Sequence, residues 1–196
     1  MTSIERLYLR ARHWQIFLLL VGGMILGQMA VLNSLSMPAR SPQDLDKAIG
    51  RLALLTVPFM LFFLSWFWAI GSFANSLAAH SDRPNIRMFR FALIYPAVYI
   101  VAFFVILSRR PDMPAVIVPF HLFAMFCMFY NLYFVAKSLA LAETRRTVSF
   151  YDFSGPFFLL WFFPIGVWII QPRINRLFRE CGYTRPDPET STVGGA

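Results

Sequence analysis

Five long apolar stretches dominate the pattern of hydrophobic and polar positions, and none of them contains an Asp, Glu, Lys or Arg. They cover residues 14–39, 52–79, 91–108, 113–136 and 153–172. Each is long enough for a membrane helix, which needs roughly 17 to 25 apolar residues. Inside a bilayer every backbone N–H and C=O must be paired within its own segment, so such runs become helices. The pattern predicts an all-α, polytopic integral membrane helical bundle.

The distribution of basic residues bears on how often the chain crosses. With five full crossings the 18 Lys and Arg residues divide equally between the two sides. If residues 153–172 enter and leave on one side, that side carries 13 of them, and the other keeps Arg40, Lys47, Arg51, Arg109 and Arg110. Cytoplasmic loops of membrane proteins are enriched in Lys and Arg. This bias favours four transmembrane helices, a cytoplasmic N-terminus and a re-entrant fifth segment.

The middle of the fifth segment carries Pro164 and Gly166. Proline removes a backbone donor and glycine relaxes the backbone, so a segment break is expected here. Either the segment folds back as a hairpin, or it is an ordinary kinked span, since proline also occurs in spanning helices. Both readings stay open at this stage.

Composition leaves no room for a separate soluble domain, because 58% of the 196 residues are hydrophobic and only 14% are charged. We divide the chain into a basic cytoplasmic N-terminus (residues 1–13), one transmembrane domain (14–178) and a polar C-terminal tail (179–196). The basic N-terminus followed by an apolar run resembles a signal peptide, but no clean cleavage site follows. An uncleaved signal anchor is therefore expected.

Small and polar residues recur at helical spacing inside the apolar stretches. Such stripes let helix backbones approach closely, and they predict helix-packing seams. The stripes could join helices of this chain to one another, or they could join this chain to a partner protein. The candidate packing residues are Gly23, Gly27, Ala30, Ser34, Ser65, Ser72, Asn75 and Asn131. Trp66 and Trp68 lie near the middle of the second segment. Mid-depth indoles require a polar or flat contact, either core packing against Ser65 or Asn131, or a bound lipid, quinone or pigment.

His121 is the one ionisable imidazole within a predicted span. It falls on the same helical face as Asn131, and polar residues at this depth usually face a bundle interior. A structural histidine is the simplest reading, and a haem or chlorin ligand is the alternative, although a haem between two spans generally needs a second histidine. No metal site or catalytic residue is predicted. Cys127 and Cys181 are expected to be free thiols, since no CxxC spacing is present.

The net charge of +8 raises the question of nucleic acid. The arginines are spread over every loop and not gathered into one groove, which is typical of side chains that reach lipid phosphates at the membrane surface. We therefore expect anionic lipids as partners and no nucleic acid.

The run at residues 157–175, FFLLWFFPIGVWIIQPRIN, resembles the C-terminal signature of small uncharacterised bacterial inner-membrane proteins, in which an FPIG turn precedes an IQPRIN-like stretch. The resemblance covers about a tenth of the chain. It implies a multi-pass protein of the bacterial inner (plasma) membrane, but no activity, ligand or site residue.

Packing surfaces are thus more evident in the sequence than chemistry. The expected function is that of a non-catalytic accessory subunit or assembly factor of a larger membrane protein complex, with other integral membrane proteins as partners and bound lipids in place of a cofactor. The alternative is a small oligomeric transporter or channel module that uses the polar faces of Ser65, Ser72, Asn75 and Asn131 as a path.

Overall fold

The computed structural model describes residues 3–35, 42–78, 83–109 and 115–182, and every element within these ranges is helical. A short helix α1 (Ser3–Arg10) precedes a helical run composed of α2 (His13–Phe17), the π-helical turn η1 (Leu18–Gly22) and α3 (Gly23–Leu35). Three long helices follow, namely α4 (Pro42–Leu77), α5 (Ile86–Arg109) and α6 (Ile117–Thr144). The last elements are α7 (Phe150–Trp161) and α8 (Phe163–Glu180). The predicted all-α fold is confirmed.

Three of these helices are long and apolar enough to cross a membrane: Lys47–Leu77, Ile86–Arg109 and Ile117–Thr144. A shorter apolar helix covers His13–Met29. Helices of this length and hydropathy are typical of a multi-pass membrane protein. The second, third and fourth predicted segments correspond to α4, α5 and α6, whereas the fifth is divided between α7 and α8, neither of which is among the spans.

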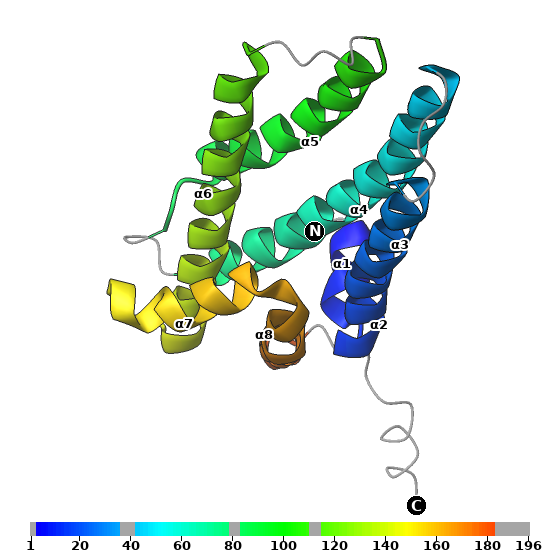
Figure 1. The fold of residues 1–196 in the computed structure, drawn as a ribbon. Coiled ribbons are helices and arrows are strands. Elements are labelled where there is room, and N and C mark those ends of the chain that lie inside the picture. Colours follow the sequence, from blue (N-terminus) through cyan, green and yellow to red (C-terminus); the bar gives the residue numbers. More distant parts are fainter. Residues whose placement is uncertain (1–2, 36–41, 79–82, 110–114, 183–196) are drawn as a thin grey trace, which may run out of the picture.

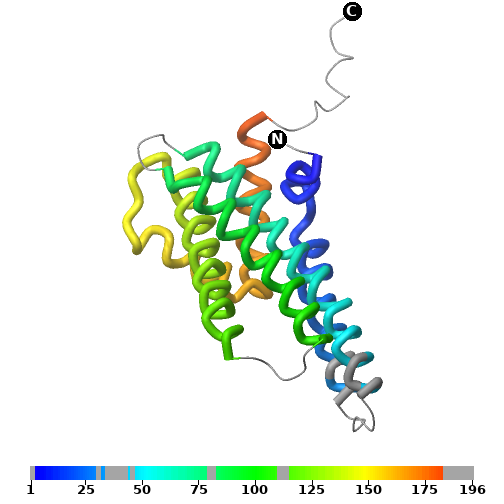
Figure 2. The backbone as a smooth tube through the Cα atoms, turned by 90° about the horizontal axis from the view of Figure 1, so that it is seen from above, coloured from blue at the N-terminus to red at the C-terminus, as the bar shows by residue number. Residues whose placement is uncertain are grey.

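The long helices α4, α5 and α6 pack against one another, α3 lies along α4, and α7 lies on the second half of α6 (Figure 1). Figure 2 shows that α1, the end of α4, the start of α5, the end of α6 and the end of α8 gather at one end of the bundle. We call this the basic end. The described Lys and Arg residues of these segments and of the turns next to them are Arg6, Arg10, Arg12, Arg83, Arg87, Arg90, Lys137, Arg145, Arg146, Arg173, Arg176 and Arg179.

The pair α7–α8 forms a helical hairpin that leaves the basic end and returns to it. Its tip contacts residues halfway along the long helices: Trp161 packs on Phe129 of α6 at 4.5 Å between ring centroids. Phe163 packs on Phe63 of α4 at 5.4 Å. The hairpin therefore reaches the middle of the bundle and covers only the half nearer the basic end.

Two local features produce the hairpin tip. Phe162 has non-helical dihedral angles (φ −89°, ψ 58°), and Pro164 occupies the first turn of α8, where its missing N–H costs no intrahelical bond. Gly166 allows the two backbones to touch, because a Cβ at this position would lie 1.7 Å from the carbonyl oxygen of Leu159. The break itself falls at Phe162, two residues before Pro164 and four before Gly166.

A second close contact fixes α4 against α5 and α6. Phe89 is fully buried and stacks on Phe134 with ring centroids 3.9 Å apart. Gly71 lies beside this stack, and a Cβ there would be 2.6 Å from Cζ of Phe89 and 3.1 Å from Cγ2 of Val135. The glycine thus makes room for the aromatic ring of the neighbouring helix.

We expect Gly71→Ala to lower the free energy of unfolding by about 1 to 3 kcal/mol, because the stacked ring of Phe89 has no free space to move into. Gly50→Ala in the same helix is the matched control, since nothing lies within 4 Å of a Cβ at that position. Denaturation of the purified protein in mixed micelles measures both. Equal stability of the two variants would contradict the close packing at Gly71.

Candidate functional site

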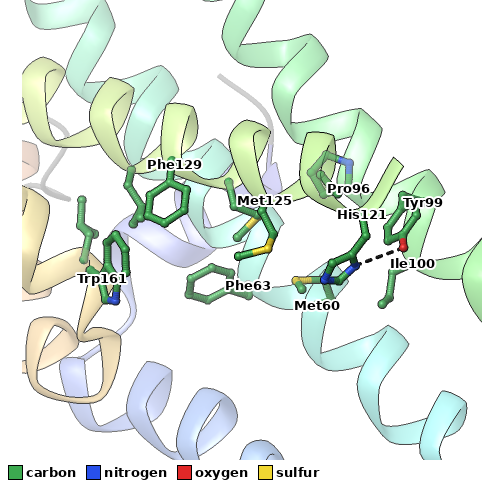
Figure 3. Close-up of a pocket in the computed structure, with 13 residues that line it drawn as sticks. Met60, Phe63, Pro96, Tyr99, Ile100, His121, Met125, Phe129 and Trp161 are labelled. Carbon is green, nitrogen blue, oxygen red and sulfur yellow. Dashed lines mark hydrogen bonds between the residues drawn. The ribbon is translucent and has the colours of Figure 1, made fainter. Parts of the chain in front are cut away.

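An apolar cavity of about 300 Å³ lies at the tip of the hairpin, between α4, α5, α6 and α7. Figure 3 shows the Tyr99 and His121 side chains at one end of the lining and Trp161 at the other. Tyr99 and His121 bring polar groups to a wall that is otherwise almost entirely apolar. The lining residues are Met60, Phe63, Pro96, Tyr99, Ile100, His121, Ala124, Met125, Met128, Phe129, Leu132, Leu160 and Trp161.

The cavity is open to the side of the bundle. His121, Met125, Phe129 and Trp161 line it and are also exposed on the surface. Because the α7–α8 hairpin stops at mid-length, no segment of the hairpin covers the first half of α6. The short fifth segment thereby creates the space that a full-length helix on this face would fill.

The polar end of the cavity consists of one hydrogen-bonded pair. The hydroxyl of Tyr99 lies 3.1 Å from Nδ1 of His121, and the two rings are 5.8 Å apart. If the neutral imidazole accepts the tyrosine proton at Nδ1, its own proton is on Nε2. No described residue is a hydrogen-bond partner of Nε2. This nitrogen is available to a ligand.

A haem between two spans generally needs a second histidine near His121. His13, the other histidine in the described ranges, packs on Trp168 of α8 with ring centroids 4.7 Å apart. Within the same ranges no group of three or more His, Cys, Asp or Glu side chains could hold a metal ion. The chemistry of the site is therefore that of an apolar pocket with a single hydrogen-bonding corner.

The predicted packing residues lie at helix contacts. A Cβ at Gly23 would be 3.7 Å from Phe59, and one at Gly27 would be 3.9 Å from Cβ of Leu55, so both glycines face α4. Ala30 and Ser34 belong to α3, but their side chains lie outside the described set.

Among the polar members of the predicted stripes, Ser65 and Ser72 are half-buried, and Asn75 and Asn131 are buried. None of them lines this cavity or a second cavity of about 340 Å³ that also borders Tyr99 and His121. Ser65 Oγ lies 2.6 Å from the hydroxyl of Tyr8 and donates to the Phe62 carbonyl at 2.8 Å. Asn131 is fully buried and donates from Nδ2 to the carbonyl of Ala92 at 2.8 Å. Buried polar atoms without a hydrogen-bond partner in the described part of the chain are Ser72 Oγ, Asn75 Oδ1, Asn131 Oδ1 and Ser138 Oγ.

The two mid-segment tryptophans find partners other than Ser65 or Asn131. Trp66 donates from Nε1 to Oε1 of Gln171 at 3.0 Å, and Trp68 donates to Oε1 of Glu5 at 3.0 Å. The two indoles thus donate to side chains of α8 and α1. The prediction that they need a polar contact gave the right chemistry and the wrong residues.

Gln171 is the centre of a polar cluster that the sequence analysis did not identify. Its Oε1 accepts from Trp66, and its Nε2 donates to the carbonyls of Tyr8 at 2.8 Å and Ala11 at 3.2 Å. Asn175, one turn later, donates to the same Ala11 carbonyl at 3.1 Å. Because Tyr8 and Ala11 lie at the carboxyl end of α1, these amides cap carbonyls that a helix end leaves unpaired. The signal in the sequence is the cluster of polar residues QPRIN directly after an apolar run.

The end of α8 is also held to α6 by an ion pair. Arg173 donates to both carboxylate oxygens of Glu143, one contact through Nε at 2.8 Å and the other through Nη2. Paired donation of this kind is the stronger geometry for arginine and a carboxylate. Both side chains are partly buried, and the pair joins α8 to α6 at the basic end.

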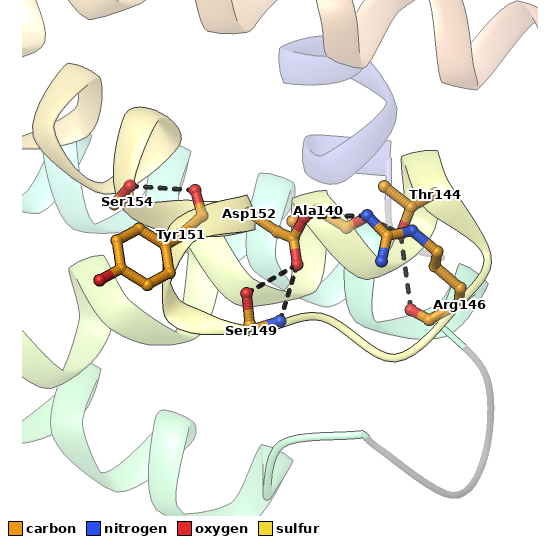
Figure 4. Close-up of polar contacts among 7 residues, drawn as sticks. All are labelled: Ala140, Thr144, Arg146, Ser149, Tyr151, Asp152 and Ser154. Carbon is orange, nitrogen blue, oxygen red and sulfur yellow. Dashed lines mark hydrogen bonds and ion pairs between the residues drawn. The ribbon is translucent and has the colours of Figure 1, made fainter.

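A capped turn starts the hairpin. Asp152 accepts from the Ser149 backbone N–H at 2.8 Å and from its hydroxyl at 3.0 Å, and it pairs with Arg146 at 2.9 Å (Figure 4). The hydrogen bonds from Ser149, followed by the charge of Arg146, hold the pKa of the Asp152 carboxyl below its ordinary value. An ionised Asp152 therefore closes the capping box at the N-terminus of α7.

The two cysteines are free, Cys127 buried in α6 and Cys181 exposed after α8. The chain matches no protein-family model, no curated protein and no solved structure. The resemblance of residues 157–175 to small bacterial inner-membrane proteins stays a prediction.

Proposed function

We propose that this protein is a non-catalytic accessory subunit or assembly factor of a larger bacterial membrane protein complex, and that it holds a lipid-soluble molecule in the cavity at the hairpin tip. It resides in the inner membrane with its N-terminus cytoplasmic. Its partners are other integral membrane proteins and anionic lipids.

The membrane topology in this proposal has four crossings and a re-entrant hairpin. The run α2–η1–α3 is the fourth crossing beside α4, α5 and α6, and α7–α8 enters and leaves on the cytoplasmic side. The charges support this orientation, because the basic end carries most of the Lys and Arg residues, whereas Lys47, Arg51 and Arg109 are the described ones at the opposite end.

The observation that carries the proposal is the lateral opening of an apolar cavity on a face that would contact lipid. Its volume of about 300 Å³ is at the lower end of the range typical for small-molecule sites, about 300 to 1,000 Å³. Water entering such a pocket would find few polar partners, whereas a hydrocarbon chain would bury its surface against Met, Phe and Leu side chains.

The same surface supports the subunit reading. The first half of α6 is exposed on most of its sides, with large apolar side chains and the hydrogen-bonding His121. A partner helix can occupy the half of this face that the hairpin leaves uncovered. The transporter alternative has less support, because Ser65 and Asn131 hydrogen-bond within helix contacts and neither cavity is lined by Ser72 or Asn75.

The proposal is tested on the full chain extracted from its native membrane in mild detergent. Native gels and mass spectrometry should reveal a stoichiometric larger assembly, and the released subunit should carry a bound molecule of lipid size. A lone homo-oligomer would overturn the subunit reading.

A cavity-filling variant isolates the bound molecule. Ala124 is buried in the cavity wall, so a tryptophan there would fill the cavity, and Ala124→Trp should abolish binding of the lipid-sized molecule. Ala102→Trp is the matched control, because Ala102 is exposed on α5 and lines neither cavity. If the Ala124→Trp protein still carried the lipid-sized molecule, binding in this cavity would be contradicted.

A further inference from the structure

The hydrogen-bonded pair Tyr99–His121 lies at the junction of two cavities. A second cavity, of about 340 Å³, lies on the side of the pair toward the start of α6 and is lined by Tyr99, His121, Phe103 and Ile117, among others. Tyr99 and His121 are the two residues that line both spaces. A ligand that fills either cavity must therefore pass or touch this pair.

The surroundings of the pair are neutral. Neither cavity is lined by a Lys, Arg, Asp or Glu among the described residues. A charged head group would be left without a counter-ion next to Phe103, Ile100 and Ile117, which is costly in apolar surroundings. A neutral head group that accepts one hydrogen bond fits the donor at Nε2 of His121, with Tyr99 holding the ring from the other nitrogen.

The shape of the first cavity suits a chain. From His121 to Leu132 the lining follows α6 for about 16 Å, at a helical rise of about 1.5 Å per residue. Trp161 lies at the far end from the polar pair (Figure 3). Met60, Met125 and Met128 contribute flexible side chains that adapt to an irregular apolar guest.

We infer that the cavity binds an amphiphile with a neutral carbonyl head and an apolar chain, with the carbonyl oxygen accepting from His121 and the chain running along α6 toward Trp161. An isoprenoid quinone and a fatty-acyl ester share this chemistry. This inference rests on the proposed function, since it specifies the molecule that the cavity holds.

Trp161 is a reporter of occupancy, because a quencher in the cavity would lie against its indole. The full-length protein in detergent is titrated with three probes: decylubiquinone, methyl 9,10-dibromostearate and 9,10-dibromooctadecane, which has the chain without a head. Saturable quenching of tryptophan fluorescence measures binding. Trp161→Phe should remove most of the quenching, and Trp168→Phe should retain it, because Trp168 packs on His13 and Phe17 and lines neither cavity.

The head interaction is tested with His121→Phe and Tyr99→Phe. His121→Phe should weaken binding of a carbonyl probe about tenfold, the effect of about one hydrogen bond, and leave the headless probe unchanged. Tyr99→Phe should also weaken binding of a carbonyl probe, but by less than His121→Phe does. Tyr95→Phe is the control on the same helix, since its hydroxyl donates to the Phe120 carbonyl at 3.2 Å and does not line either cavity.

The outcomes distinguish a quinone from an acyl ester, and recognition of the carbonyl head from binding of the apolar chain. Tighter binding of decylubiquinone that His121→Phe weakens identifies a quinone, and the same pattern for the bromo-ester identifies an acyl ester. Equal binding of all three probes, unchanged in His121→Phe, overturns the head assignment and leaves the proposed chain-binding function standing. Absence of saturable binding by every probe overturns both.

Discussion

Gly166→Ala is expected to prevent the α7–α8 hairpin from closing. A Cβ at residue 166 would lie 1.7 Å from the carbonyl oxygen and 2.5 Å from the carbonyl carbon of Leu159. These are backbone atoms, so the collision cannot be relieved by a side-chain rotation, and the two helices must separate. The expected loss of unfolding free energy is more than about 3 kcal/mol, the upper range for overpacking.

Separation of the helices would also move Leu160 and Trp161, which close one end of the apolar cavity. The variant should therefore lose the bound lipid-sized molecule as well as stability, both measurable after purification in mild detergent. Gly155→Ala in α7 is the matched control, since nothing lies within 4 Å of a Cβ there and alanine favours the helix. A Gly166→Ala protein as stable as this control would contradict the contact between the two backbones.

The long helices could be predicted because each depends on local composition alone. The uncharged stretches at 52–79, 91–108 and 113–136 have the length and hydropathy of a span, and α4, α5 and α6 include most of their residues. The helices extend beyond these stretches into polar sequence, as α4 does from Pro42, because a helix need not end where the charges begin.

The path of the fifth segment could be predicted only in part. Its length permits a span, and Pro164 with Gly166 signals a break, so two readings followed from the same residues. The contact that selects the hairpin is the touching of Gly166 and the Leu159 carbonyl, a tertiary approach that no pattern of hydrophobicity contains. The charge bias of the loops concerns how this hairpin sits in a membrane, and the re-entrant topology that it favours stays a prediction.

The candidate site, too, could be predicted from the sequence only in part. His121 was visible as a polar residue in an apolar stretch, but the structure leaves it exposed, whereas Asn131, expected on the same helical face, is fully buried. Tyr99 was not identified, because a tyrosine in an aromatic-rich helix has no distinguishing spacing, and its role arises only from the 3.1 Å contact across α5 and α6. The cavity was equally invisible, since it results from the hairpin stopping halfway.

Gln171→Leu, which keeps the side-chain volume nearly constant, is expected to lower the free energy of unfolding strongly. The amide oxygen accepts from the buried indole of Trp66, and the amide nitrogen donates to the carbonyls of Tyr8 and Ala11. A leucine would leave at least the Trp66 N–H and the Tyr8 carbonyl buried without partners. Each unpaired group costs about 1 to 3 kcal/mol, so the two together should lower the free energy of unfolding by about 2 to 6 kcal/mol.

The reason for this cost can be tested with the partner residue. Trp66→Phe removes the donor, so the double variant Trp66→Phe with Gln171→Leu should lose less stability than the sum of the two single variants. Gln171→Glu keeps the acceptor for Trp66 but places carboxylate oxygens against the carbonyls of α1, and it should release α1 while retaining the contact to α4. Protection of the α1 amides against hydrogen exchange reports that release. Gln28→Leu on the exposed face of α3 is the control, and it should leave stability and exchange unchanged. When both partners are removed, the unpaired indole disappears but the lost packing remains. If the stability losses of the two single variants simply added in the double variant, the cost would therefore come from lost packing and not from an unpaired indole.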